Sequence, residues 1–145
     1  MTHAADLRAW ALGVFTREAG TELLLRAFDG RLATPDLPWI STHDTVHGAW
    51  IDFDGIPAYA DAYPGEEQAI LRVAASLGGS ASVVLGDWLA GLHCKHVQLV
   101  LAAVSHAAGI HEHWSGMSFN PDGTPDTMIT NTALYPWPEN DAQRD

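Results

Sequence analysis

The chain has 145 residues, of which 18 are acidic and 7 are basic, so its formal net charge at pH 7 is −11. A field of this sign repels phosphate backbones and anionic lipid, which argues against direct nucleic-acid binding and against docking on a membrane. The length and the 47% apolar content predict one globular domain with a sizeable core. We expect this domain to cover residues 1–138, followed by a frayed acidic tail at 139–145.

Cysteine content and terminal sequence indicate the compartment. Cys94 is the only cysteine, so no intrachain disulfide can form. The N-terminal stretch has neither the basic nor the apolar part of a signal peptide, and no apolar run approaches the length of a membrane span. These features predict a cytoplasmic protein.

Residues 1–34 and 65–120 contain no proline. Because proline breaks helix interiors, the long helices are expected in these two blocks. In the first block apolar residues recur at helical spacing, with a bend expected at Gly20 and a stop at Asp29–Gly30. In the proline-rich middle, residues 49–53 alternate as a short strand that places Ile51 and Phe53 on one face.

The second block predicts three helices. The first covers about 64–78, with acids in its first turn and Gly78–Gly79 at its end. A short helix is expected at about 86–91, and the clearest helix of the chain at about 94–108. The predicted buried stripe of this last helix consists of Val97, Val100, Leu101 and Val104.

The C-terminal part predicts extended structure. Residues 120–123, Asn-Pro-Asp-Gly, have the chemistry of a tight turn, and the flanking stretches at 114–119 and 127–133 predict a β-hairpin. Residues 134–138 are expected to be extended. The predicted fold class is therefore mainly α (α+β), with a helical core, a short strand near 49–53 and a C-terminal β-hairpin.

Five of the eight histidines gather around the 94–108 helix: His93, His96, His106, His111 and His113. Neutral imidazole is a good ligand for zinc and other transition metals. Ten helical residues separate His96 from His106 by about 15 Å, too far for both to bind one ion. The sharpest metal-site hypothesis is therefore His106, His111 and His113, with Glu112 supporting the ligands.

Other sites are weaker candidates. His93, Cys94 and His96 form a second group, but Cys94 projects about 100° away from His93 on a helix. His43 and His47 lie in a polar loop and are candidates to complete either group. A third interpretation makes Cys94 a nucleophile activated by the helix N-terminus, although no third orienting group is evident.

The histidines also have structural interpretations. A histidine in a last helical turn interacts well with the helix dipole, which accounts for His106, and histidines beyond a helix end satisfy its unpaired carbonyls. If all eight histidines titrate near pH 6.5, they change the net charge from −11 to about −3, so a pH-dependent self-association is another interpretation.

Familiar catalytic signatures are absent: there is no GxxxxGK[ST], GxGxxG, GxSxG or HExxH. Six tryptophans and much apolar material indicate core packing or aromatic anchors at an interface. The sequence therefore favours a small non-catalytic binding or interaction module, with a protein partner or self-association as a homodimer and no cofactor. The alternative is a metal-dependent hydrolytic enzyme of the zinc type, with a metal-activated water at His106, His111 and His113.

Two segments of the sequence are distinctive: GLHCKHVQLVLAAVSHAAG at 91–109 and LYPWP at 134–138. Together they resemble small uncharacterised proteins of actinobacteria. The resemblance extends over about half of the chain. It implies a bacterial cytosolic source and brings no activity and no site residue.

Overall fold

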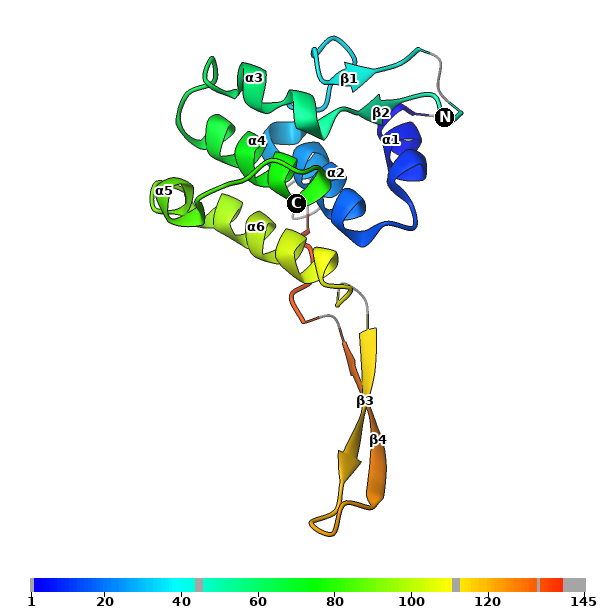
Figure 1. Ribbon diagram of the computed structural model, residues 1–145. Helices are drawn as coiled ribbons and strands as arrows, with labels where there is room; N and C mark the ends of the chain where they lie inside the picture. The colour runs from blue at the N-terminus through cyan, green and yellow to red at the C-terminus, as the bar shows by residue number, and fades with distance from the viewer. Residues whose placement is uncertain (1, 44–45, 111–112, 133, 140–145) are drawn as a thin grey trace.

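A computed structural model of the chain describes residues 2–43, 46–110, 113–132 and 134–139. Figure 1 shows a body of helices from which a two-stranded hairpin projects. In the body, α2 (Phe15–Arg26) packs against both α4 (Gly65–Gly78) and α6 (Cys94–Ala107). The protein is mainly α with two small antiparallel sheets among the described residues, which confirms the predicted fold class.

Shorter elements surround this central packing. Helix α1 (His3–Ala11) contacts α2 and strand β2. The first sheet pairs β1 (Ile40–Ser41) with β2 (Trp50–Ile51). The remaining elements of the body are η1 (Ala27–Gly30), η2 (Phe53–Gly55), α3 (Pro57–Ala60) and α5 (Leu85–Leu89).

The strand predicted near 49–53 is shorter than expected, since β2 covers only Trp50–Ile51, but the predicted burial of Ile51 and Phe53 is confirmed. Ile51 and Phe53 are both buried in the core, whereas Asp52 is exposed. The strand ends at Ile51 because the Asp52 carboxylate accepts a hydrogen bond from the backbone N–H of Gly55 at 3.2 Å, which begins the 3-10 turn η2.

The bend expected at Gly20 is wrong. The chain turns between α1 and α2 at Gly13, which has a φ of +99°, whereas Gly20 lies inside α2. A Cβ at Gly20 would lie 2.9 Å from the Phe53 ring and 3.1 Å from the carbonyl oxygen of Ala74. Gly20 is therefore a site of close packing, which explains why a weak helix former occupies the middle of a helix.

The predicted stop at Asp29–Gly30 follows the end of α2 closely. Phe28, Asp29 and Gly30 all adopt positive φ, at 52°, 56° and 81°. Such a conformation is strained for phenylalanine. Packing offsets part of the strain, because the Phe28 ring lies over the His96 ring with their centroids 4.5 Å apart.

The predicted buried stripe of α6 is wrong for two of its four residues. Val100 is buried and Val97 partly so, but the side chains of Leu101 and Val104 are 44% and 48% exposed. The face turned towards the body carries His96, Leu99, Val100, Ala102, Ala103, Ser105 and His106. Polar residues lie both on the buried side of α6 (His96, Ser105 and His106) and on its exposed side (Lys95 and Gln98), so the sequence pattern does not identify the buried face; the small alanines allow close contact with α2.

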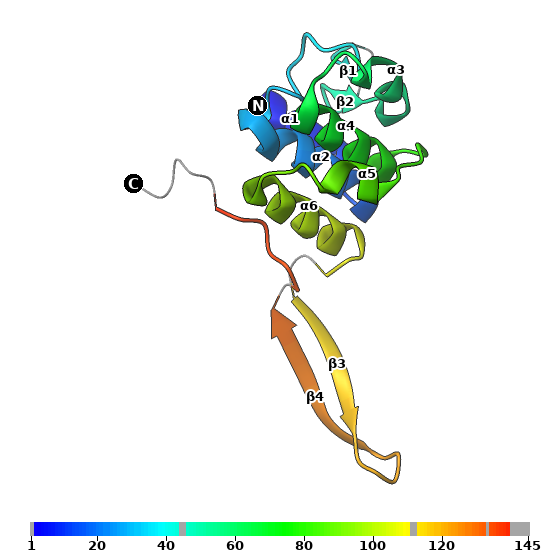
Figure 2. The same ribbon diagram turned by 90° about the vertical axis from the view of Figure 1, so that its left-hand side faces the viewer.

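The C-terminal hairpin is confirmed. Strand β3 (His113–Phe119) pairs with β4 (Pro125–Thr132), and Met117 lies opposite Met128. The predicted helices at 64–78 and 86–91 are also present, as α4 and as α5 at Leu85–Leu89. Viewed from the side, the hairpin extends away from the body at the end where α6 lies (Figure 2).

Candidate functional site

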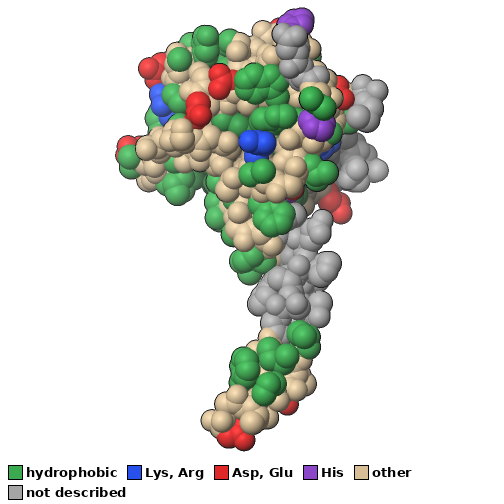
Figure 3. All heavy atoms as spheres, turned by 45° about the vertical axis from the view of Figure 1, so that its right-hand side comes forward, with side chains coloured by type: hydrophobic (Ala, Val, Ile, Leu, Met, Phe, Trp, Pro, Cys, Tyr) green, Lys and Arg blue, Asp and Glu red, His purple; other side chains and the backbone are tan. Residues whose placement is uncertain are grey.

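One face of the β3–β4 hairpin is apolar and exposed. Met117 and Phe119 are two residues apart on β3 and so share a face, and Met128 lies opposite Met117. Their side chains are 43%, 63% and 66% exposed, in the same order. Figure 3 shows hydrophobic side chains gathered on this hairpin. We call Met117, Phe119 and Met128 the hairpin apolar face.

On the opposite face, Ser118 and Thr127 form polar contacts with one another. The Ser118 Oγ and Thr127 Oγ1 atoms are 2.7 Å apart, and the Thr127 N–H donates to Ser118 Oγ at 3.1 Å. The connecting turn is closed by Asp122, whose carboxylate accepts hydrogen bonds from the N–H and hydroxyl of Thr124 and whose pKa these bonds lower. Near its tip, the hairpin therefore has large apolar side chains on one face and hydrogen-bonded hydroxyl groups on the other.

A second exposed apolar surface lies on α6 and consists of Leu101 and Val104, which we call the α6 stripe. The two residues are three positions apart and therefore lie on the same side of the helix. Helix α6 contains no aspartate or glutamate. The prediction that Leu101 and Val104 are buried thus missed this exposed surface, because polar and apolar residues lie on both sides of α6.

His106 is held by two partners from distant parts of the sequence. Its Nε2 atom lies 2.9 Å from Oε1 of Glu18 on α2, and its Nδ1 atom lies 3.0 Å from the indole N–H of Trp137. Because an indole N–H is only a donor, Nδ1 must accept, which places the ring proton on Nε2, where it is donated to Glu18. Both ring nitrogens therefore serve to join α2, α6 and the C-terminal segment.

The described residues do not test the predicted metal site. His111 lies outside the described residues, and of His113 only the backbone, at the start of β3, is described. Within the described ranges no three histidine, cysteine or acidic side chains are grouped to hold a metal ion. The site at His106, His111 and His113 stays a prediction, and it requires His106 to exchange at least one of its two partners for the metal.

The histidines at the start of α6 meet at Glu66. His93 is the N-cap of α6, and its Nδ1 atom accepts from the N–H of Lys95 at 3.2 Å. The backbone N–H of His93 donates to Glu66, and this bond is the main reason why the pKa of that carboxyl is lowered. His96 Nδ1 lies 3.2 Å from Glu66 Oε1, but without the angle of a hydrogen bond.

Cys94 does not form a catalytic pair of good geometry. The thiol is exposed, and its sulfur lies 3.8 Å from His93 Nδ1, a nitrogen already used in capping the helix. The two histidines predicted as further ligands, His43 and His47, flank a loop between β1 and β2. Figures 1 and 2 place this sheet across α2 and α4 from α6, so His43 and His47 do not join either histidine group.

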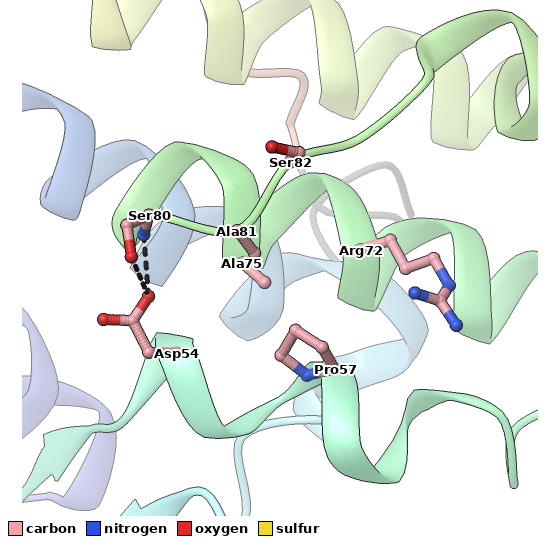
Figure 4. Close-up of a pocket in the computed structure, with 7 residues that line it drawn as sticks. All are labelled: Asp54, Pro57, Arg72, Ala75, Ser80, Ala81 and Ser82. Atoms are coloured by element: carbon pink, nitrogen blue, oxygen red, sulfur yellow. Dashed lines mark hydrogen bonds between the residues drawn. The ribbon is translucent and has the colours of Figure 1, made fainter.

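Charged groups line several pockets of the body, and most of them are paired within the chain. The pocket in Figure 4, about 340 Å³, has Asp54 at one end, where it accepts from Ser80, and Arg72 at the other. Arg72 pairs with Asp61 at 2.5 Å and stacks over Trp88. Arg72 is therefore paired within the chain, and the Asp54 carboxylate is held by the neutral N–H and hydroxyl groups of Ser80.

The second pocket, about 190 Å³, lies between α1, α2 and α6. It contains the Glu18–His106 pair, and Glu22, which pairs with Arg8 at 2.5 Å and with Arg26 at 2.7 Å. Burial raises the pKa of Glu22, but the hydrogen bonds from the two arginines outweigh it and lower the pKa below its usual value. Here too the charged groups stabilise the fold.

Comparison with known proteins yields no relative: no family model, no curated protein and no solved structure matches the chain. Among the described residues, none of the helices has both the length and the apolar character required to cross a membrane. The function must therefore be argued from the surfaces of the protein itself.

Proposed function

We propose that the protein is a small non-catalytic interaction module that binds another protein chain through the hairpin apolar face. One observation carries the proposal: Met117, Phe119 and Met128 form an exposed apolar face on an arm that projects from the body. A two-stranded hairpin is only marginally stable alone in water and normally needs a packing partner for one face.

The energetics favour a covered hairpin. Full burial of a methionine or phenylalanine side chain contributes about 1.5–3 kcal/mol. The three residues of the hairpin apolar face are already partly buried, so covering them contributes on the order of a few kcal/mol before the entropy of association is subtracted. A free energy of this size is typical of the few residues that anchor a protein–protein interface.

The chemistry of the hairpin indicates a protein surface as its partner. Asp122 and Asp126 lie at its tip and on β4, and the whole chain carries a charge of −11. Anionic lipid and nucleic acid are therefore disfavoured. Methionines adapt their shape to a partner, as they do at other protein-binding surfaces.

Site-specific photo-crosslinking tests the proposal. The photoreactive amino acid p-benzoylphenylalanine is placed at position 119, on the hairpin apolar face, or at position 118, on the opposite face of the same strand. In producing cells we expect a discrete protein adduct from position 119 that is absent from position 118 and is lost when Met117 and Met128 are both changed to threonine. No adduct, or equal adducts from both faces, contradicts the proposal.

A further inference from the structure

Residues 134–138 follow the hairpin and return to the body, and we call them the strap (Figure 2). We infer that docking of the strap on α2 and α6 holds the hairpin in its folded form and so controls whether the hairpin apolar face is presented. The control of presentation rests on the proposed function, whereas the coupling between the strap and the hairpin does not.

The two ends of the arm are joined at Ser105 of α6. Its hydroxyl donates to the carbonyl of Ile110 at 2.8 Å and accepts from the backbone N–H of Tyr135 at 3.3 Å. The N–H of Leu134 donates to the same Ile110 carbonyl at 3.1 Å. Because Ser105 is only 5% exposed, its hydroxyl depends on these protein partners rather than on water. The bonds close a chain loop that contains the whole hairpin, from before β3 to after β4.

Closing this loop favours the hairpin through chain entropy. A two-stranded hairpin is marginal in water, because strand pairing must offset the entropy that is lost when the strands are brought together. When Ile110 and Leu134 are already held together, much of that entropy is lost before β3 and β4 pair. Strap docking and hairpin folding therefore stabilise one another, and each changes the equilibrium constant of the other by the same factor.

The strap is docked through Trp137. Its indole N–H donates to His106 Nδ1 at 3.0 Å, and the guanidinium carbon of Arg26 lies 5.0 Å from the centroid of its ring. Arg26 also donates to the carbonyl of Pro138 at 3.2 Å and is itself held by an ion pair with Glu22. The Trp137 ring packs against the hydrophobic core. These contacts hold the strap to α2 and α6 at once.

The prolines on both sides of Trp137 reduce the entropy lost on docking. Pro136 and Pro138 fix their own φ and restrict the residue before each, so the strap is already extended before it docks. Leu134 and Tyr135 are 65% and 36% exposed, so Trp137 supplies most of the side-chain packing of the strap. A segment held by one large side chain belongs to the part of a protein that opens most readily. The strap therefore has two accessible states, docked and released.

Chemical shifts of the full-length protein test the coupling. Trp137→Ala removes the anchor, and Ser105→Ala removes both hydroxyl bonds that close the loop. In both variants the Cα shifts of β3 and β4 should move towards random-coil values while those of α4 stay fixed. The ratio of folded to unfolded hairpin should fall at least about tenfold in Trp137→Ala and about fivefold in Ser105→Ala.

Trp88→Ala is the matched control. Trp88 is also partly exposed and stacks with an arginine, Arg72, at 5.1 Å, but it lies on α5. Its replacement should leave the hairpin shifts unchanged. Hairpin shifts that stay at wild-type values in Trp137→Ala or in Ser105→Ala overturn the inference. Loss of the α2 and α4 shifts in Trp137→Ala also overturns it, because Trp137 is then a residue of the body core rather than the anchor of a strap.

Photo-crosslinking in producing cells connects the strap to binding. p-Benzoylphenylalanine at position 119 is combined with Trp137→Ala or with Trp88→Ala, and the yield of the protein adduct should fall at least about tenfold in the first combination only. An undiminished adduct with Trp137→Ala overturns the control of presentation. If position 119 gives no adduct in the otherwise wild-type chain, the proposed function fails, and the chemical shifts still decide whether the strap holds the hairpin.

Discussion

Large apolar side chains are buried in the helical body but exposed on the β3–β4 hairpin. In the body, Trp39 and Phe53 are almost completely buried, and the indole N–H of Trp39 donates to the carbonyl of Leu32 at 2.9 Å. In the hairpin, Phe119 and Met128 are about two-thirds exposed. The difference teaches that the body buries its largest apolar side chains within one chain, whereas the hairpin leaves its own at the surface, which is why we propose a partner for the hairpin.

The largest expected effect is on the body core. Changing Trp39 to alanine should lower the free energy of unfolding by about 3–5 kcal/mol, because it leaves a cavity and removes the hydrogen bond to Leu32. Phe119→Ala on the hairpin should change it by less than about 0.5 kcal/mol in dilute monomer. Urea unfolding followed by tryptophan fluorescence or circular dichroism measures both. Similar losses for the two variants would mean that the hairpin folds as part of the body.

A smaller effect is expected at Gly20. In an open helical position glycine to alanine stabilises by about 0.5–1 kcal/mol, and Gly86 in α5, with no atom within 4 Å of an added Cβ, should behave so. Gly20→Ala should instead destabilise by about 1–3 kcal/mol, because its Cβ meets Phe53 and the Ala74 carbonyl. Thermal unfolding of both variants measures the difference. If Gly20→Ala is stabilising, the α2–α4 contact is looser than described.

Glu22 should make the stability of the body depend on pH. Its pKa is lowered in the folded protein, so its contribution is present above the unfolded-state value of about 4.3 and is lost as the pH falls through the folded-state pKa. Glu22→Gln should lower the free energy of unfolding by about 1–2 kcal/mol at pH 7, and by almost nothing when the pH is below the folded-state pKa of Glu22. Denaturant titrations at several pH values test this.

Asp122 on the hairpin serves as the control for Glu22. It is also an acid with a lowered pKa, but it is fully exposed in a turn whose hydrogen bonds are local to the arm. Asp122→Asn should leave the unfolding of the body unchanged at every pH. A pH-independent loss for Glu22→Gln would instead show that its arginine pairs do not stabilise the charged form.

The smallest expected effect lies within the hairpin. Thr127→Ala removes the contact between Oγ1 and the Ser118 hydroxyl and should shift the hairpin population by a few tenths of a kcal/mol. In dilute protein the Cα chemical shifts of β3 and β4 should move towards random-coil values, while those of α2 and α4 stay fixed. Thr16→Ala, exposed on α2, should leave the hairpin shifts unchanged. Loss of body signals in Thr127→Ala would show coupling between the two regions.

Much of the fold was predictable because local patterns specify it. The Asn-Pro-Asp-Gly turn predicted the hairpin, and the glycine pair at 78–79 predicted the end of α4. The bend at Gly20 was not predictable, because a glycine within a helix has the same local signature whether it bends the chain or admits a neighbour. Only the positions of Phe53 and Ala74 decide between the two.

The functional surfaces were less predictable. The partners of His106 are 88 residues away at Glu18 and 31 residues away at Trp137, so no local spacing indicates them. Composition and the absence of catalytic motifs predicted a binding module, but they did not indicate where on the protein its binding surface lies. The hairpin suggests a location, because it exposes Met117, Phe119 and Met128 on an arm that projects from the body.

The sequence by itself determined the acidic charge, the positions of the main helices and the presence of the hairpin, because these follow from composition and from periodicity over a few residues. The tertiary structure decided which face of α6 is buried and that the hairpin stands apart from it. Polar residues lie on both the buried and the exposed side of α6, so its sequence pattern does not select a face; packing against α2 selects it and leaves Leu101 and Val104 about half exposed.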